Sequence, residues 1–297
     1  MHKLRVLLLG DKGQLGQYVK REWLTKFPAE TNNDICVMKN FRINSIVDFE
    51  KILEKVESCH YDYIINCMAY TNVDKAETID MNSLINEKLP AYLGWISKIR
   101  SIPIVHISTD MVFDGTSSFA YSVKDIPNPV NAYGKAKLDG ERALLKQSYI
   151  STVIRTSWIF SELGNNFLTY MLKAKGNVNV FNQLGQPVSA KFIAEYIVNN
   201  IANNRLPRKL IHLTHDDPFM KNRYSFANYI KQTCKLDINL DSINIENLSL
   251  PAKRNYNCEL CCYPTPREFM YLHIPPRPLS YYIEYHILKY KETYAKY

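Results

Sequence analysis

The sequence predicts an α/β protein built on a doubly wound parallel sheet, and two observations support this. Short apolar segments alternate with amphipathic segments along roughly the first 160 of the 297 residues. This alternation is typical of strands that are each followed by a helix, which covers both faces of a parallel sheet. Beyond residue 160 the alternation weakens, so we expect a smaller mixed α/β lobe there.

The expected elements follow one another at short intervals. Strands are expected at residues 4–9, 34–38, 63–67, 102–107 and 152–156. Helices are expected directly after the first strand and at 45–58, 79–99 and 131–147. In the second half the sequence predicts helices near 165–175, 190–203 and 224–234 and a strand at 210–213. The Pro- and Tyr-rich tail from residue 251 yields no assignment.

Glycine is scarce in this chain, yet three of its ten glycines lie within residues 10–16. Gly10 permits a tight turn, Gly13 lets the backbone approach a phosphate, and Gly16 allows a helix to pack closely on a strand. The free N–H groups of the following helix favour an anion. This loop predicts a dinucleotide site of the Rossmann type, with Gln14 and Leu15 also along the cofactor.

The end of the second expected strand indicates which dinucleotide binds. NAD-dependent proteins place a carboxylate there to bind the adenosine 2′-hydroxyl, but this chain has Met38-Lys39-Asn40-Phe41-Arg42. Lys39 and Arg42 either neutralise a 2′-phosphate or are solvated surface cations. The pattern favours NADPH, with NADH as the alternative.

Tyr133 and Lys137 lie four residues apart at the start of an expected helix, so they share one face. A nearby ammonium group favours the phenolate and moves a tyrosine toward acid–base chemistry. Such a pair is common in helices, but here the strand ending Ser108-Thr109-Asp110 precedes it. That strand carries a hydroxyl to the carboxyl edge of the sheet, where ligands bind. Thr109, Tyr133 and Lys137 are therefore the candidate catalytic residues.

Together these motifs resemble the extended short-chain dehydrogenase/reductases and, more closely, the dTDP-4-dehydrorhamnose reductase family. The likeness covers about residues 4–200. Its segments are residues 7–16, 66–77, 108–115, 131–141, 155–160 and 164–167, with fainter matches at 183–190 and 251–254.

The resemblance implies reduction of the C4 ketone of a nucleotide-linked 4-keto-6-deoxy sugar by NADPH. Tyr133 would protonate the sugar oxygen, Lys137 would bind the cofactor ribose, and Thr109 would hydrogen-bond the carbonyl. Residues 1–160 would form the cofactor domain and residues 161–297 mainly the substrate lobe, with about 186–203 returning to the first domain.

The resemblance also implies further contacts. Met68, Ala69 and Tyr70 would lie along the cofactor, together with Asn66. Those facing the substrate would be Asp110, Met111, Trp158, Asn166 and Phe167. Trp158 is alternatively a core aromatic residue. Asn86 corresponds to the helix asparagine of the family and is alternatively a surface residue, while His106 is expected to be a core histidine.

Several alternatives remain open at this level. Met111 replaces the tyrosine usual in bacterial relatives, and a thioether cannot deprotonate a carbon, so an added epimerase activity is not expected. The substrate is alternatively a UDP-linked 4-keto-6-deoxy or 2-acetamido-2,6-dideoxy sugar. A binding subunit similar to the β subunit of methionine adenosyltransferase is the non-enzymatic alternative, against which the complete catalytic set argues.

Composition limits the other classes of function. The net charge of +8 is spread along the chain without a basic block, so nucleic-acid binding is not expected. No apolar run approaches the roughly 20 residues of a membrane span, and we expect a cytoplasmic protein, with a homodimer suggested by the family. No metal site is expected, because Cys258-x-x-Cys261-Cys262 lacks a second ligand pair.

Overall fold

The computed structural model describes residues 3–31, 33–39, 41–245, 249–261 and 277–294. Their centre is a six-stranded parallel sheet in the order β2-β1-β3-β4-β5-β9. Its strands are β1 (Arg5–Leu9), β2 (Asp34–Val37), β3 (Tyr63–Asn66), β4 (Ile104–Thr109), β5 (Thr152–Thr156) and β9 (Leu210–His212). The order reverses between β1 and β3, and this reversal opens a crevice at the carboxyl edge, where ligands bind in such folds.

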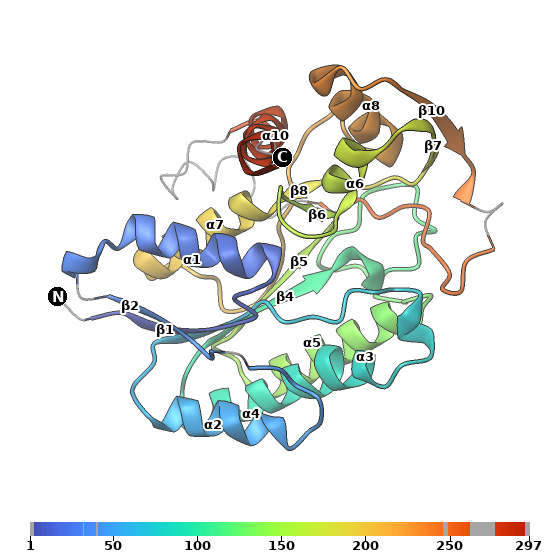
Figure 1. Ribbon diagram of the computed structural model, residues 1–297. Helices are drawn as coiled ribbons and strands as arrows, with labels where there is room; N and C mark the ends of the chain where they lie inside the picture. The colour runs from blue at the N-terminus through green and yellow to red at the C-terminus, as the bar shows by residue number, and fades with distance from the viewer. Residues whose placement is uncertain (1–2, 32, 40, 246–248, 262–276, 295–297) are drawn as a thin grey trace.

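Helices cover both faces of this sheet (Figure 1). One face carries α1 (Gln14–Lys26) and α7 (Ala190–Ala202); the other carries α2 (Asp48–Glu57), α4 (Leu89–Arg100) and α5 (Ala132–Gln147). In β1, Val6 and Leu8 join the core under α1, whereas Leu7 and Leu9 join the core under α2. Successive side chains of a strand point to opposite faces, so an unbroken apolar strand serves both layers. The doubly wound fold is thereby confirmed.

Short turns complete the first part of the chain. The helix expected at 79–99 is divided into α3 (Met81–Ser83), a π-helical turn (Leu84–Lys88) and α4. Single 3₁₀ turns occur at Ala29–Thr31, Lys75–Glu77 and Asp110–Val112.

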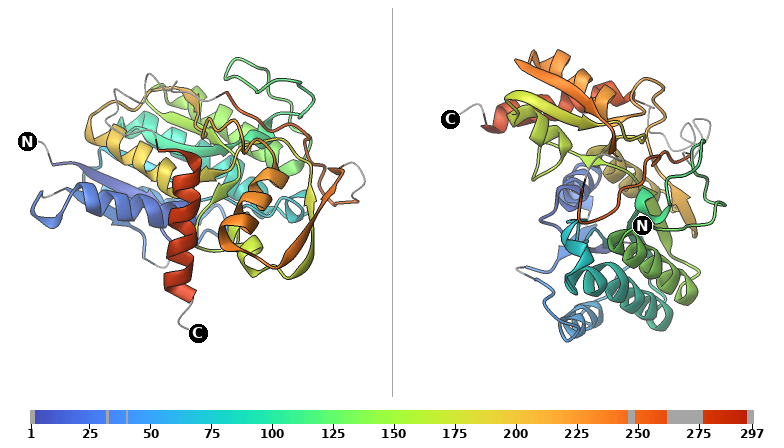
Figure 2. Two further views of the ribbon diagram at one scale, coloured as in Figure 1. Left: turned by 90° about the horizontal axis from the view of Figure 1, so that it is seen from above. Right: turned by 90° about the vertical axis from the view of Figure 1, so that its right-hand side faces the viewer.

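A smaller lobe stands over the carboxyl edge (Figure 2, right-hand view). It contains the parallel strand pair β7 (Gly176–Phe181) and β10 (Ile238–Ile243), with α6 (Phe167–Lys173) and α8 (Arg223–Cys234). The short pair β6 (Ile159–Phe160) and β8 (Val188–Ser189) connects this lobe to the sheet domain.

The second half of the chain crosses between these two parts. Helix α7 packs against α1, and β9 joins the large sheet as an edge strand, although the sequence analysis had placed residues 210–213 in the second lobe. The tail contains a further helix, α10 (Leu279–Tyr294), for which we had no assignment. Strands β7 and β10 were also unexpected.

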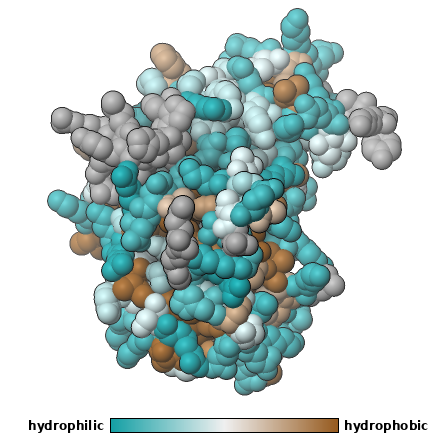
Figure 3. Space-filling view, turned by 90° about the vertical axis from the view of Figure 1, so that its left-hand side faces the viewer, coloured by the Kyte–Doolittle hydropathy of each residue, from teal (hydrophilic) through white to brown (hydrophobic). Residues whose placement is uncertain are grey.

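Among the described residues, none of the helices combines the length and apolar character needed to cross a bilayer. On the face that forms the left-hand side of Figure 1, hydrophilic residues surround scattered apolar ones (Figure 3).

Candidate active site

The glycine loop joins β1 to α1 at the crevice. Gly10 has φ +83°, and a Cβ there would lie 2.8 Å from the backbone carbon of Cys67. A Cβ on Gly16 would lie 2.1 Å from the carbonyl oxygen of Gly10, so the helix could not approach the strand. Gly13 is the N-cap residue of α1 and provides no side-chain cap, and the first turn of the helix carries no acidic residue. The free N–H groups therefore form a cradle that fits a phosphate.

Three cavities lie in series along this edge, with volumes of about 930, 230 and 300 Å³. Phe41 and Arg42 line both the first and the second cavity, and Met68 lines both the second and the third. The cavities thus form one groove that passes the glycine loop. It ends at Tyr133 and Lys137, a course that fits an extended dinucleotide.

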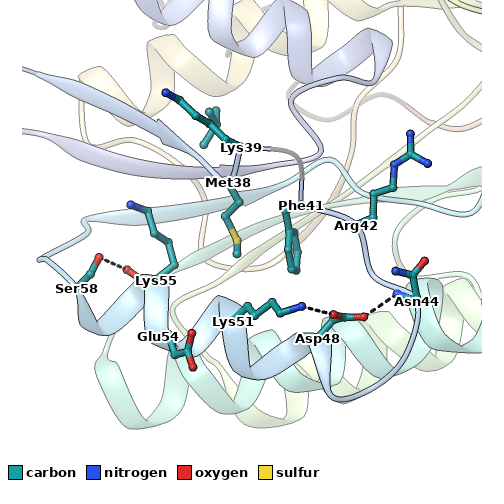
Figure 4. Close-up of a pocket in the computed structure, with 11 residues that line it drawn as sticks. Met38, Lys39, Phe41, Arg42, Asn44, Asp48, Lys51, Glu54, Lys55 and Ser58 are labelled. Carbon is teal, nitrogen blue, oxygen red and sulfur yellow. Dashed lines mark hydrogen bonds and ion pairs between the residues drawn. The ribbon is translucent and has the colours of Figure 1, made fainter.

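The outer end of the groove lies between β2 and α2 (Figure 4). Lys39 and Arg42 extend to opposite sides of Phe41 in this view, and both are exposed. Lys51 is paired with Asp48 at 2.7 Å, so its charge is already balanced. Of the two predicted cations, only Arg42 also lines the cavity beside Gly10.

Tyr133, in the first turn of α5, and Thr109, at the end of β4, meet at the inner end of the groove. Burial and the carboxyl group of Asp110 raise the pKa of Tyr133 to about 12, while a hydrogen bond with the Thr109 side chain opposes this shift. The sequence analysis expected Lys137 to lower this pKa, but here burial has the larger effect. The phenol is therefore protonated at neutral pH, as a general acid must be.

Lys137 is 1% exposed and points back toward β4. Its ammonium group donates to the carbonyl oxygen of Ile107 at 2.6 Å and lies 3.3 Å from His106 Nε2. Burial lowers the pKa of Lys137 to about 8, against the opposing charge of Glu141.

His106 is a buried histidine that lies beside this lysine. Its Nδ1 lies 3.0 Å from the side-chain nitrogen of Asn66, whose oxygen accepts from the backbone N–H of Met68. These contacts connect Lys137 to the loop that lines the groove. His106 is a core residue, as the sequence predicted, but its contact with Lys137 was not expected.

Asp110 is buried directly after Thr109, whose hydroxyl donates to Asp110 Oδ1 at 2.9 Å. Burial raises the pKa of Asp110 to about 6. Its second oxygen, Oδ2, is buried with no acceptor or donor partner among the described residues. A buried carboxylate oxygen without a partner is the arrangement expected where a ligand hydroxyl binds.

Trp158 follows β5 in a left-handed conformation, with φ +36°. Its indole lies so close to Gly185 that a Cβ there would be 2.7 Å from the ring. Its Nε1 is buried without a partner among the described residues. The strain and the free donor argue against an ordinary core aromatic residue.

The loop after β3 forms one wall of the groove. Met68 and Ala69 line the inner cavity, together with Thr71, whereas Tyr70 is not in its lining. Asn86 is fully buried and holds the backbone of Tyr70 through bonds of 3.1 and 2.9 Å. The alternative prediction that Asn86 is a surface residue was therefore wrong.

The loop before α6 forms the opposite wall. Gln14 accepts from the Ser161 hydroxyl at 2.9 Å and lines the inner cavity with Leu15. The side chain of Asn166 caps α6 and donates to the carbonyls of Ser161 and Leu163. It therefore holds this loop against the start of α6.

Phe167 packs against Phe226 in the small lobe, with ring centroids 5.5 Å apart. The backbone N–H of Met111 donates to the hydroxyl oxygen of Thr109 at 3.2 Å. Among the described residues no group of three or more potential ligands could hold a metal ion, and Cys262 lies outside them.

Comparison with known proteins places this site in a family. The RmlD substrate binding domain family matches residues 4–279. The chain belongs to this family. The resemblance predicted from the motifs is thereby confirmed.

Relatives of this RmlD-family chain include curated reductases. A dTDP-4-dehydrorhamnose reductase of Aggregatibacter actinomycetemcomitans is 34% identical over 200 residues, which is 65% of this chain and 66% of the relative. This chain thus spans just under two thirds of that relative's length. A second dTDP-4-dehydrorhamnose reductase, from Sinorhizobium fredii, is 29% identical over 283 residues, 90% of this chain and 92% of the relative.

Solved structures share the fold over almost the whole chain. A dTDP-4-dehydrorhamnose reductase of Clostridium acetobutylicum is 26% identical with a TM-score of 0.80, covering 96% of this chain and 98% of that one. A Bacillus anthracis dTDP-4-dehydrorhamnose reductase in complex with NADP is 24% identical with a TM-score of 0.81, covering 97% and 100%.

Part of the RmlD-family site was not predicted from the sequence. Thr71, Ser108 and residues 163–165 line the inner cavity, but they are small or loop residues without a pattern of their own. Arg223 stacks on Trp158 with 4.4 Å between its guanidinium carbon and the ring centroid. A single arginine at a helix start resembles any surface residue, so nothing in the sequence indicated this contact.

Proposed function

We propose that this protein reduces the C4 ketone of a nucleotide-linked 4-keto-6-deoxy sugar with NADPH, in the manner of a dTDP-4-dehydrorhamnose reductase. The observation that carries this proposal is the meeting of Thr109, Tyr133 and Lys137 at the inner end of the groove. The names of its RmlD-family relatives support the same substrate class. The reaction takes place in the cytoplasm in this proposal, and a homodimer is its expected assembly.

The glycine loop would hold the diphosphate of the cofactor, and Arg42 would hold its 2′-phosphate. Bound NADPH supplies a hydride for the sugar C4 carbon. Lys137 would orient the ribose by moving its ammonium group from the carbonyl oxygen of Ile107 to the ribose hydroxyls. The NADP complex of the Bacillus anthracis neighbour is consistent with this cofactor.

Tyr133 would donate its phenolic proton to the C4 oxygen as the carbon–oxygen double bond is reduced. Thr109 would turn its hydroxyl from Asp110 Oδ1 to the same oxygen, donate a hydrogen bond to it and stabilise the charge that develops there. The product is the C4 hydroxyl. Asp110 and Trp158, each with a buried polar atom that has no hydrogen-bond partner among the described residues, would bind the sugar ring.

The test is an assay of NADPH absorbance with dTDP-4-keto-L-rhamnose and UDP-4-keto-L-rhamnose in parallel. The proposal predicts cofactor oxidation with at least one of these sugars, and the faster one identifies the base. Tight NADPH binding with no turnover of either sugar would instead support a binding subunit.

A further inference from the structure

The small lobe contains a partly buried cation that the proposed reaction does not use. Arg223 is the first residue of α8, and its Nε is buried without an acceptor among the described residues. No carboxylate forms an ion pair with it among those residues. A positive charge in the first turn of a helix opposes the helix dipole. Burial, dipole and missing partner all disfavour an arginine here on structural grounds.

The guanidinium is nevertheless held in a defined position. Its Nη2 donates to Gln183 Oε1 at 3.1 Å, and Gln183 Nε2 in turn donates to the carbonyl of Asn255 at 2.8 Å. The backbone N–H of Arg223 donates to the Gln183 carbonyl at 3.0 Å. One flat face of the guanidinium lies over Trp158 at 4.4 Å. Stacking and hydrogen bonds thus fix its plane and leave Nε free.

Two of the predicted substrate residues lie beside this donor, because Arg223 stacks on Trp158 and feels the charge of Asp110. Cys258 also acts electrostatically on Arg223, and among the described residues neither Asp110 nor Cys258 forms an ion pair with it. Within the described part of the chain, Trp158 Nε1 and Asp110 Oδ2 also have no hydrogen-bond partner at normal distance, although the Cys258 thiol interacts with the Asp110 carboxyl group. Three neighbouring side chains therefore each present a buried polar atom that no described residue partners at normal distance, and such atoms are rare unless a ligand completes them.

We propose that Arg223 binds the phosphate adjacent to the sugar in the nucleotide-sugar substrate and so determines the placement of the sugar between Asp110 and Trp158. This inference rests on the proposed function. A guanidinium suits a phosphate because it offers parallel donors in one plane, and stacking on an indole keeps that plane fixed. Asp110, which carries a negative charge at neutral pH, suits the sugar hydroxyls instead.

The experiment compares Arg223→Met, Arg223→Lys and the wild type by titration with dTDP, dTMP, UDP and UMP in the presence of NADPH. Loss of a charge-assisted hydrogen bond should weaken binding of the diphosphates by about tenfold to a hundredfold. Binding of the monophosphates, which lack the second phosphate, should change by less than about threefold. Arg223→Lys should restore part of the diphosphate affinity, because it keeps the charge but not the planar donors.

Controls separate this role from a structural one. Arg142→Met removes a cation from the exposed face of α5 and should leave all four affinities unchanged. NADPH binding and the far-UV circular dichroism of each variant report folding. If Arg223→Met unfolds, Arg223→Lys carries the comparison, since it must still weaken the diphosphates more than the monophosphates.

The outcomes are distinct. Equal weakening of monophosphates and diphosphates, or no weakening of either, overturns the assignment. A loss seen only with the complete nucleotide sugar and not with the diphosphate also overturns it, because Arg223 would then bind the sugar. Absence of turnover by the wild type contradicts the proposed function, whereas normal wild-type turnover with an unaffected Arg223→Met variant contradicts only this inference.

Discussion

Gly13 and Gly16 lie three residues apart in the same loop, but glycine serves a different purpose at each. At Gly16 an added Cβ would collide with backbone, whereas at Gly13 it would lie 3.5 Å from the Gly10 carbonyl oxygen, an ordinary contact. Gly16 is therefore required by packing. Gly13 is open toward the groove, where a side chain would compete with a phosphate.

These two positions give a matched pair of variants. Gly16→Ala should lower the free energy of unfolding by about 1–3 kcal/mol because the helix must shift from the strand. Gly13→Ala should leave stability within about 0.5 kcal/mol and weaken NADPH binding at least tenfold. Urea unfolding and fluorescence titration measure the two effects. A stable Gly16→Ala protein would show that the loop geometry is wrong.

The buried carboxyl of Asp110 makes stability depend on pH. Its folded pKa of about 6 exceeds the ordinary value of 3.8, because burial disfavours the charge. The favourable neutral form is fully present below the unfolded pKa, and its contribution is lost as pH rises through the folded pKa. Asp110→Asn removes this loss.

Asp110→Asn should therefore gain stability relative to the wild type as pH rises. The difference in free energy of unfolding should increase by about 2 kcal/mol between about pH 4.5 and pH 7.5. Urea unfolding of both proteins at the two pH values measures it. A difference that stays constant with pH would mean that Asp110 is not the group that titrates.

Among the elements, α10 illustrates what the sequence does and does not reveal. Its buried residues, Leu279, Tyr282, Ile283, His286 and Ile287, have regular helical spacing. The pattern was present, but the many tyrosines of the tail hid it because they occur on both the buried and the exposed face. In β7 only Val178 and Val180 are buried, and the intervening asparagines made the segment look like a loop. The first 160 residues were easier to assign because parallel strands are apolar on both faces.

A buried network attaches α10 to the rest of the molecule. His286 Nδ1 lies 2.8 Å from Glu162, and Nε2 lies 2.8 Å from the Ser189 hydroxyl, which caps α7. Tyr18 donates to Glu162 at 2.6 Å. Burial opposes ionisation of Glu162, but bonds from His286 and Tyr18 outweigh it and lower the Glu162 pKa to about 2. One histidine thus joins α10, α7 and the loop that leads to the groove.

His286→Leu conserves volume but removes the hydrogen bonds of His286 with Glu162 and with Ser189. It should reduce the free energy of unfolding by about 3 kcal/mol, because a buried carboxylate and a buried hydroxyl lose partners. Leu288→Ala, on the exposed face of the same helix, should cost less than about 1 kcal/mol. Urea unfolding distinguishes them. Equal costs would show that the network contributes little to docking of α10.

At the scale of the whole molecule, the sequence predicted the edge of the sheet at which the site lies, because strand ends and the glycine loop determine it. Thr109, Tyr133 and Lys137 were predicted from their own motifs and do meet there. Arg223 and Gln183 come from the small lobe, where no pattern indicated which residues approach the sheet. Contacts between lobes depend on tertiary packing, which local sequence patterns do not report.

Ligand binding should stabilise the whole molecule in proportion to affinity. NADPH at about 100 times its Kd should add about 2.7 kcal/mol and raise Tm by about 5 °C or more. NADH should raise Tm less than NADPH does if a cation of the protein binds the 2′-phosphate. Arg42→Ala should abolish this difference, whereas the matched Lys39→Ala should preserve it, because only Arg42 also lines the cavity beside the loop. The reverse result would assign the phosphate to Lys39.

The central claim is that Tyr133, at the inner end of a dinucleotide groove, protonates the sugar ketone. The most direct test is Tyr133→Phe, measured for turnover and for NADPH affinity in the same preparation. Loss of the general acid should reduce kcat by about 10²- to 10⁴-fold, with the Kd for NADPH within about threefold of the wild type. A Tyr133→Phe protein that retains wild-type kcat would contradict the claim.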